Sequence, residues 1–269
     1  MKNPLKDNQI SRNLKTRFAP SPTGYLHLGH ALAAKEAFEF GAQNCLLRIE
    51  DIDHTRCKPE FTQAIYDDLR WLGFDWPEPV RVQSKHLSDY AKVIEQLRER
   101  GLIYRCFKTR SQLTAAPPAP LSATLENQKL MDGKAYAWRL SIAAAIKTRS
   151  TTPLTYIDTG ETKTVNLGAL EDIVLARKDI GTSYHIAVTH DDALQGITHV
   201  VRGADFTEQT AYHVLLQELM GWPRPIYHHH GLIMGDDGKK LSKRSFAASI
   251  ASLRDTGQSA QEVLARAVV

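Results

Sequence analysis

Short apolar runs alternate with amphipathic segments along the first hundred residues of this chain. The runs of strand length lie at residues 16–19, 45–49 and 102–107, and helical patterns lie between them at 29–40, 59–72 and 87–100. This alternation favours a parallel sheet covered by helices. We expect Gly41 to cap the first of these helices at its C-terminal end, and Pro59 to open the second.

The pattern changes after residue 107. The stretch 115–120 contains three prolines, so it is neither a regular helix nor a central strand. The segments that follow are short and β-like, which predicts a largely β insertion. Helical patterns then return at 183–194 and 206–220, with strands at 197–202 and 226–231 and a helical end. We therefore divide the chain into a first core half (15–107), an insertion (108–180), a second core half (181–245) and a C-terminal helical segment (246–269).

Composition narrows the class of protein only slightly. With 269 residues, 42% of them hydrophobic, the chain can bury a full globular core. A net charge of +4 is compatible with a polyanionic partner such as tRNA, but it is weak evidence alone. The three cysteines are scattered, so a disulfide framework is not expected and a reducing cytoplasm fits. No apolar stretch approaches membrane-spanning length and no signal peptide is recognisable, so we expect no membrane partner.

The first motif with chemical content is His27-Leu28-Gly29-His30, where an apolar strand gives way to a helix. A helix N-terminus offers backbone N–H groups and partial positive charge to a phosphate, and Gly29 allows close approach. The two imidazoles can donate hydrogen bonds to phosphoryl oxygens in a transition state. By itself, the motif is more typical of two surface histidines beside a helix cap.

The second motif is Lys240-Leu241-Ser242-Lys243-Arg244, which follows a loop rich in glycine and aspartate. Displacement of pyrophosphate from ATP moves negative charge onto the leaving group, and lysines on a flexible loop can neutralise that charge. Such a basic string alone is commonly a solvated patch. In this order along the chain, the two motifs together predict a site that holds a triphosphate from both sides.

These strings make the chain resemble the class I aminoacyl-tRNA synthetases, whose HIGH and KMSKS motifs they match. The segments 17–24, 48–53 and 201–205 are similar to the glutamate-specific branch in particular, and the resemblance covers about residues 15–110 and 180–245. It implies an α/β fold with a Rossmann-type parallel sheet and a β-rich inserted subdomain. It also implies that ATP, accompanied by Mg²⁺, binds at the C-terminal edge of the sheet.

The resemblance assigns expected roles to individual residues. Arg17 matches the residue that grips the side-chain carboxylate of L-glutamate, a bidentate task that suits a guanidinium. The other expected glutamate-binding residues are Ala19 (through its backbone), Ser21, Glu50, Tyr184 and Arg202. The expected ATP-binding residues are His27, Gly29, His30 and Lys243, and the expected catalytic residues are His27, His30, Lys240 and Lys243. Singly, each could serve in an ion pair or in core packing.

The expected RNA acceptor depends on the length of the sequence. Glutamyl-tRNA synthetases continue into a helical anticodon-binding region, whereas this sequence stops soon after Arg244. It therefore resembles the shortened branch that attaches glutamate to queuosine in the anticodon of tRNA(Asp), and we expect a monomer. The alternatives are a compact glutamyl-tRNA synthetase that charges the tRNA 3′ end, a non-catalytic RNA-binding relative, and another nucleotidylyl transferase.

Metal binding is not predicted. The family often carries a C-x-C pair followed by a tyrosine and a third cysteine, but here the matching stretch is Cys106-Phe107-Lys108 and no cysteine follows. Because a tetrahedral zinc site needs about four ligands, we predict no zinc. The three histidines at 228–230 are expected to point to alternating faces of an extended segment. Asp191 and Asp192 are expected to have a structural or solvent-facing role.

Overall fold

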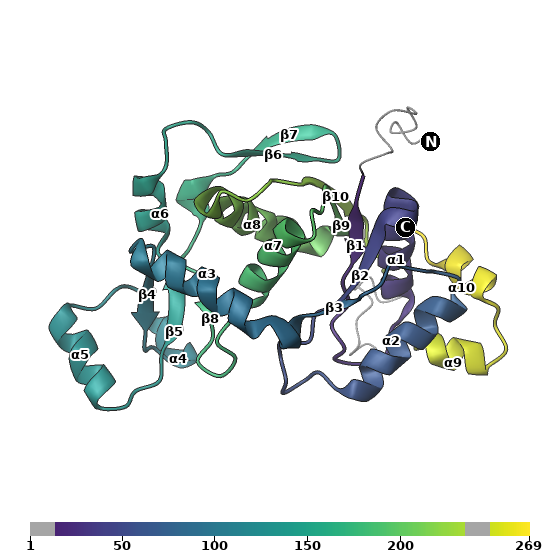
Figure 1. Ribbon diagram of the computed structural model, residues 1–269, viewed down its shortest axis with the longest axis horizontal. Helices are drawn as coiled ribbons and strands as arrows, with labels where there is room; N and C mark the ends of the chain where they lie inside the picture. The colour runs from purple at the N-terminus through teal and green to yellow at the C-terminus, as the bar shows by residue number, and fades with distance from the viewer. Residues whose placement is uncertain (1–13, 235–247) are drawn as a thin grey trace.

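The computed structural model describes residues 14–234 and 248–269, in which strands and helices alternate (Figure 1). The strands are β1 (Thr16–Phe18), β2 (Cys45–Ile49), β3 (Arg81–Val82), β4 (Ile103–Cys106), β5 (Ala137–Leu140), β6 (Thr155–Asp158), β7 (Glu161–Thr164), β8 (Val174–Ala176), β9 (His199–Gly203) and β10 (Ile226–His230). The α-helices are α1 (Leu28–Gly41), α2 (Pro59–Trp71), α3 (Leu87–Glu99), α4 (Arg110–Ala115), α5 (Ala123–Met131), α6 (Ile142–Thr148), α7 (Tyr184–Leu194), α8 (Thr207–Met220), α9 (Ile250–Asp255) and α10 (Ala260–Arg266). Within these described ranges, no helix is both long and apolar enough to cross a membrane.

Two groups of strands lie edge to edge at the centre of the molecule. One is the parallel group β1-β2-β3, and the other has the order β7-β6-β10-β9, parallel except at β7. The carbonyl of Lys15, just before β1, accepts the backbone N–H groups of Thr198 (3.0 Å) and His199 (3.1 Å) at the start of β9. The strands therefore follow the order β3-β2-β1-β9-β10-β6-β7. The chain order reverses between β1 and β9, which is where parallel α/β sheets leave a crevice at their carboxyl ends.

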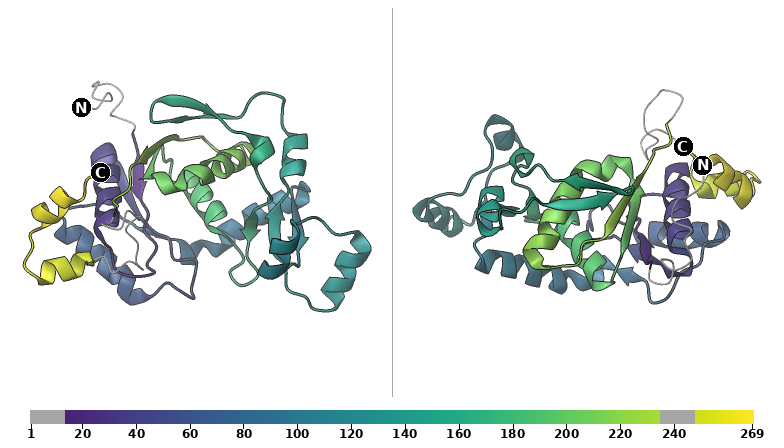
Figure 2. Two further views of the ribbon diagram at one scale, coloured as in Figure 1. Left: turned by 180° about the vertical axis from the view of Figure 1, so that it is seen from behind. Right: turned by 90° about the horizontal axis from the view of Figure 1, so that it is seen from above.

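Both faces of this sheet are covered, as the predicted α/β fold requires. Val200 and Val201, neighbours on β9, belong to different clusters of buried apolar side chains. Val200 packs in the cluster that contains residues of α3, α7 and α8, and Val201 packs in the cluster formed with α1, α2, α9 and α10. Figure 2 shows the central strands between these two sets of helices. Parallel strands that are buried on both faces read as continuous apolar runs, as in residues 45–49.

Helix α1 packs against β1 more closely than a helix with a side chain at position 41 could. A Cβ atom on Gly41 would lie only 2.0 Å from Oγ1 of Thr16, which itself donates a hydrogen bond to the carbonyl of Ala37 (2.8 Å). The prediction that Gly41 is the C-terminal cap is wrong, because Gly41 is the last helical residue and Ala42, which has a positive φ of 45°, is the cap. Contact between helix and strand, rather than the turn, requires this glycine.

The third strand of the parallel group is β3, and not the strand predicted at 102–107. β3 has two residues and carries no apolar pattern that a sequence could reveal. The predicted segment does form a strand, β4, but β4 pairs antiparallel with β5, which pairs antiparallel with β8. An apolar run of strand length indicates a buried strand, but it does not say which sheet that strand joins.

The segment 108–180 is mixed rather than largely β. It holds β5 to β8 together with the short helices α4, α5 and α6. Thr109, Ser122 and Ser141 cap these helices, and each side chain accepts a backbone N–H of the first turn. Those caps are helix-start signals that the reading of the sequence missed. The division of the chain at 15–107, 108–180, 181–245 and 246–269 stays a prediction.

A buried carboxylate on α7 ties this helix to two strands of the parallel group β1-β2-β3. Oδ1 of Asp192 accepts hydrogen bonds from Nε of Arg17 on β1 (2.9 Å) and from Nη2 of Arg48 on β2 (2.7 Å). All three side chains are almost fully buried. The sequence predicted a structural or a solvent-facing role for Asp192. The structure shows the structural role, because Asp192 is buried in this ion pair.

We expect Asp192→Ala to lower the free energy of unfolding by about 3–5 kcal/mol, because two buried guanidinium groups would lose their counter-charge. Denaturant titration followed by circular dichroism measures this loss. The matched control is Glu60→Ala, which removes a carboxylate from an exposed pair with Lys58 and should change stability by less than about 1 kcal/mol. An equally small effect of Asp192→Ala would contradict the central role of this contact.

Candidate functional site

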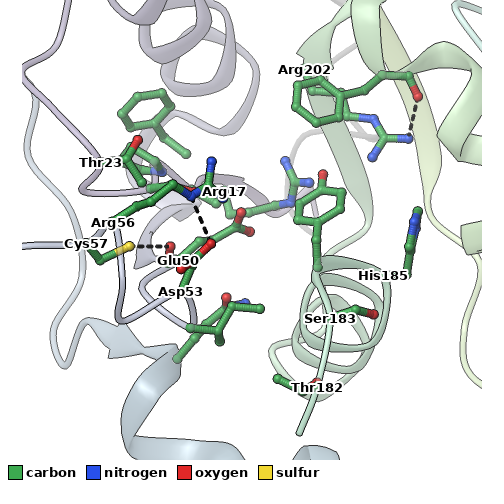
Figure 3. Close-up of a pocket in the computed structure, with 18 of the residues that line it drawn as sticks. Arg17, Thr23, Glu50, Asp53, Arg56, Cys57, Thr182, Ser183, His185 and Arg202 are labelled. Carbon is green, nitrogen blue, oxygen red and sulfur yellow. Dashed lines mark hydrogen bonds and ion pairs between the residues drawn. The ribbon is translucent and has the colours of Figure 1, made fainter. Parts of the chain in front are cut away.

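A cavity of about 690 Å³ opens where the strand order reverses, at the ends of β1 and β9 (Figure 3). Figure 3 shows Arg17 and Glu50 on one side of it, and Arg202 and His185 on the other. Every residue predicted to bind the amino acid lines this cavity, namely Arg17, Ala19, Ser21, Glu50, Tyr184 and Arg202. The fold thus brings together residues that are far apart in the sequence, although their roles stay predictions.

Arg17 is held in place by protein groups on both sides of the reversal. Its Nε donates to Asp192, and its Nη1 donates to the backbone carbonyl of Val201 on β9 (3.2 Å). Burial alone would lower the pKa of Arg17, but Asp192 and Tyr184 together raise it above its ordinary value. The cavity therefore contains a fixed cation.

Glu50 provides the opposite charge, and its charge depends on pH near neutrality. It follows β2, and its backbone N–H donates to the carbonyl of Pro20 (3.1 Å), which places the side chain beside the β1–α1 connection. Burial raises the pKa of Glu50 to about 7, although Arg48 and Arg17 act to lower it. A buried carboxyl of this kind ionises more readily when a cation binds next to it, so it suits an ammonium group.

Tyr184 and Arg202 form the wall opposite Glu50. Tyr184 begins α7, and burial raises its pKa to about 12, so its hydroxyl keeps its proton at neutral pH. Arg202, near the end of β9, donates from Nη2 to Oγ1 of Thr210 (2.7 Å). A hydroxyl donor together with a guanidinium group makes this wall suited to a carboxylate.

The two histidines of the first motif cap helix α1. Nδ1 of His27 accepts the backbone N–H of Gly29 (3.1 Å), and Nδ1 of His30 accepts the backbone N–H of His27 (3.2 Å). Because an accepting ring nitrogen carries no proton, each neutral ring holds its proton on Nε2. A Cβ on Gly29 would lie 3.0 Å from Cε1 of His27, so this glycine leaves room for the folded-back imidazole. His30 lines the cavity.

Lys240 and Lys243, the other two predicted catalytic residues, lie outside the described residues. The chain is described again from residue 248, and Ser249 forms an antiparallel bridge with His27. The backbone N–H of Ile250 also donates to the carbonyl of Leu26 (2.8 Å). The segment after the second motif is therefore attached to the first motif.

A charged cluster at the cavity was missed by the sequence reading. Oδ2 of Asp53 accepts from Nε of Arg56 (2.8 Å) and lies 3.4 Å from Nη1 of Arg177. Hydrogen bonds from Thr55 and Arg56 lower the pKa of Asp53 to about 2, against the effect of burial. Asp53 thereby holds two arginines from distant parts of the chain beside the cavity. Asp53 belongs to the segment 48–53, which the family resemblance singled out, but nothing in the sequence indicated Arg177 as its partner.

The arrangement fits a small zwitterion better than a metal ion. Two guanidinium groups, a tyrosine hydroxyl and a carboxyl group line the same cavity, so a ligand with carboxylate and ammonium groups would find a partner for each charge. In the described part of the chain, no three His, Cys, Asp or Glu side chains gather as metal ligands would. His228 and His229 do alternate, since His228 packs against Phe40 and His229 contacts Asp158.

Comparison with known proteins gives a consistent result. The family described as "tRNA synthetases class I (E and Q), catalytic domain" matches residues 13–268. A "Glutamyl-Q tRNA(Asp) synthetase" from Rhodobacter capsulatus is 42% identical over 92% of this chain and 97% of that protein. A "Glutamate--tRNA ligase" from Coprothermobacter proteolyticus is 35% identical over 92% of this chain.

A solved structure supports the same fold. A glutamate tRNA ligase from Elizabethkingia meningosepticum, in complex with its amino acid, aligns with a TM-score of 0.73 and 29% identity over 92% of this chain. The match covers 54% of that structure and 56% of the Coprothermobacter ligase, so this chain spans about half the length of these ligases.

We expect Glu50 to titrate near pH 7 in the ligand-free protein. Because this pKa lies above that of an unfolded glutamate, the stability linked to the protonated form is complete below about pH 4.5 and is lost as the pH rises through about 7. Between about pH 5 and pH 8, the unfolding free energy of the wild type should fall by roughly 1–3 kcal/mol more than that of Glu50→Gln. Denaturant titrations at several pH values, with NMR of the carboxyl carbon, test this. Parallel pH profiles of the two proteins would contradict it.

Proposed function

This chain belongs to the class I tRNA synthetase family for glutamate and glutamine, and from that membership we propose that it activates L-glutamate with ATP and transfers it to RNA. The family makes it an aminoacyl-tRNA-synthetase-type ligase. The observation that carries the amino-acid assignment is the cavity itself, which is lined by two buried arginines and a buried carboxyl group. This pattern of charge is complementary to glutamate.

The bound glutamate would lie between the two walls of the cavity. Arg17, Arg202 and the Tyr184 hydroxyl donate to its side-chain carboxylate, which a neutral glutamine side chain would satisfy less well. The ammonium group lies by Glu50, with Ser21 and the backbone of Ala19 as further partners. Its charge stabilises the ionised form of Glu50, so glutamate binding and loss of the Glu50 proton are coupled.

The activation step needs an in-line attack on ATP. An oxygen of the glutamate α-carboxylate forms a bond to the α-phosphorus, the bond to the bridging oxygen breaks, and pyrophosphate leaves with that electron pair. His27 and His30 donate from Nε2 to phosphoryl oxygens, while Lys240 and Lys243 neutralise charge on the leaving group. Gly29 lies at the ATP side, and Mg²⁺ accompanies the nucleotide. The bridge between Ser249 and His27 supports placing the second motif beside the first.

The second half-reaction uses an RNA hydroxyl. The hydroxyl oxygen attacks the carbonyl carbon of glutamyl-adenylate, AMP leaves, and the hydroxyl proton is lost. For the acceptor we propose queuosine in the anticodon of tRNA(Asp), because the Rhodobacter protein that carries this name matches nearly end to end. The competing acceptor is the 3′ end of a tRNA, which the similarity to glutamate–tRNA ligases supports.

We propose that the protein acts as a monomer in the cytoplasm and needs no zinc. Cys106 is a buried free cysteine on β4, and Nζ of Lys108 donates to the backbone carbonyls of Ala116 (3.2 Å) and Pro117 (2.7 Å). A lysine ammonium therefore ties the proline-rich segment to the end of β4, which supports an insertion that holds together without a metal.

With ATP, labelled glutamate and queuosine-containing tRNA, we expect the label on an anticodon-loop fragment after ribonuclease digestion. Matched tRNA(Asp) that lacks queuosine serves as the control and should accept little label. Label on the 3′-terminal adenosine of either tRNA would instead identify the compact glutamyl-tRNA synthetase. Absence of glutamyl-adenylate would leave the non-catalytic alternative.

We expect Lys243→Ala to lower kcat for ATP–pyrophosphate exchange about a hundredfold while KM for ATP changes little, because the lost charge acts mainly in the transition state. Lys92→Ala, at an exposed position on α3, removes the same charge elsewhere and should behave like the wild type. Equal kcat values for the two variants would refute the catalytic role of Lys243.

A further inference from the structure

Most of the N–H groups of Arg202 donate to other groups of the protein. Its Nε donates to Nε2 of His229 (3.2 Å), and its Nη1 lies 3.1 Å from Nδ1 of His213. Its Nη2 donates to Thr210 and, at 3.4 Å, to the carbonyl of Phe206. A guanidinium has five N–H groups, so these contacts with described residues leave one, on Nη1, for a ligand in the cavity.

The contacts of Arg202 dictate the proton positions on the two histidines. An arginine can only donate, so Nε2 of His229 and Nδ1 of His213 must both be unprotonated acceptors. The proton of His229 therefore sits on Nδ1, and that of His213 sits on Nε2. Both rings are neutral, since burial and the nearby Arg202 hold the pKa of His213 well below its ordinary value, and burial lowers the pKa of His229.

A further partner fixes each ring in its tautomer. Nδ1 of His229 lies 3.0 Å from Oδ1 of Asp158, a buried carboxylate that can only accept this proton. Nζ of Lys163 contacts the other oxygen of Asp158 (3.0 Å). On the opposite side, Nε2 of His213 lies 3.1 Å from Nδ1 of His185, a ring that lines the cavity.

These contacts form one chain across the second half of the sheet. Asp158 is on β6, His229 on β10 and Arg202 on β9, and these three strands are neighbours in the sheet. His213 on α8 and His185 on α7 complete the chain from the helices above them. The middle histidine of the run at 228–230 therefore has a partner on each side of its ring.

We propose that His213 and His229 are positioning residues that hold Arg202 with a single N–H aimed at the anionic group of the substrate, and that Asp158 and His185 hold the tautomers this requires. The geometry of the chain is independent of the reaction, whereas its effect on glutamate rests on the proposed function. Neither histidine touches the substrate in this arrangement.

The first test is NMR of the ligand-free wild-type protein with nitrogen-labelled histidine. Long-range proton–nitrogen spectra at pH 7 report the tautomer of each ring, and the variants described below assign the signals. We expect His229 to carry its proton on Nδ1 and His213 to carry its proton on Nε2. The same tautomer in both rings, or a doubly protonated ring, would overturn the arrangement whatever the reaction is.

The second test exploits the different nitrogens that face Arg202. An asparagine at 213 can place an amide oxygen near the former Nδ1, and a glutamine at 229 can place one near the former Nε2. His213→Asn and His229→Gln should therefore retain most of the affinity for glutamate. His213→Leu and His229→Leu leave a buried N–H of Arg202 without an acceptor and should raise KM for glutamate about ten- to hundredfold, with much less change in kcat.

Two variants that exchange the amides between the two positions, together with Arg202→Leu, complete the experiment. All variants are assayed by ATP–pyrophosphate exchange with tRNA present. His213→Gln and His229→Asn have side chains of the wrong length to place the amide oxygen near the ring nitrogen that faced Arg202, so both should behave like the leucine variants. If Arg202→Leu raises KM for glutamate but both leucine variants keep the wild-type KM, the positioning role is wrong. If the wild type forms no glutamyl-adenylate, or if Arg202→Leu leaves KM unchanged, the assignment of Arg202 to glutamate fails, and the NMR result still decides the geometry.

Discussion

A carboxylate on α7 forms ion pairs with two buried guanidinium groups on adjacent strands, and the shape of the cavity depends on this contact. Without Asp192, Arg17 and Arg48 would be buried cations side by side, which the low polarity of a protein interior makes very unfavourable. Arg17 also lines the cavity, so one ion pair serves both the packing of the sheet and the charge of the site. The α7 helix that supplies Asp192 also supplies Tyr184, which couples the position of that wall to the same contact.

The remainder of the site follows from the strand order. The strand order reverses between β1 and β9. Helix α1, which follows β1, packs on one face of the sheet, and α7 and α8 pack on the other face. The space between these helices therefore stays open at the carboxyl ends of the strands. Arg17 enters from the first strand group and Arg202 from the second. Each is fixed by its own set of acceptors, so the two cations are held in position before a ligand arrives, which reduces the ordering that binding must impose.

Sequence patterns predicted the elements that have strong local signals and missed the features set by tertiary contacts. The apolar run at 45–49 and the long helices were predicted correctly, and the family resemblance selected Arg17, Glu50, Tyr184 and Arg202, which do meet in one cavity. The two residues of β3 have no pattern, and an apolar run could not reveal that β4 joins a separate sheet. The contacts of Arg202 could not be predicted from the sequence for a different reason, because no regular spacing along the chain relates Asp158, His213 and His229.

The histidine cap of α1 has a consequence for which ligands the helix start can accept. Nδ1 of His27 and Nδ1 of His30 are both occupied by backbone N–H groups, so while the first turn stays wound each imidazole can offer only a donor at Nε2. This hydrogen-bond pattern suits a group rich in acceptor oxygens, whereas a group that needs an acceptor nitrogen would have to displace one of these two backbone contacts. The start of α1 therefore favours groups that accept hydrogen bonds over groups that donate them. The two contacts that begin the helix also fix the orientation of both imidazole rings, so the rings need little reorientation when charge develops nearby.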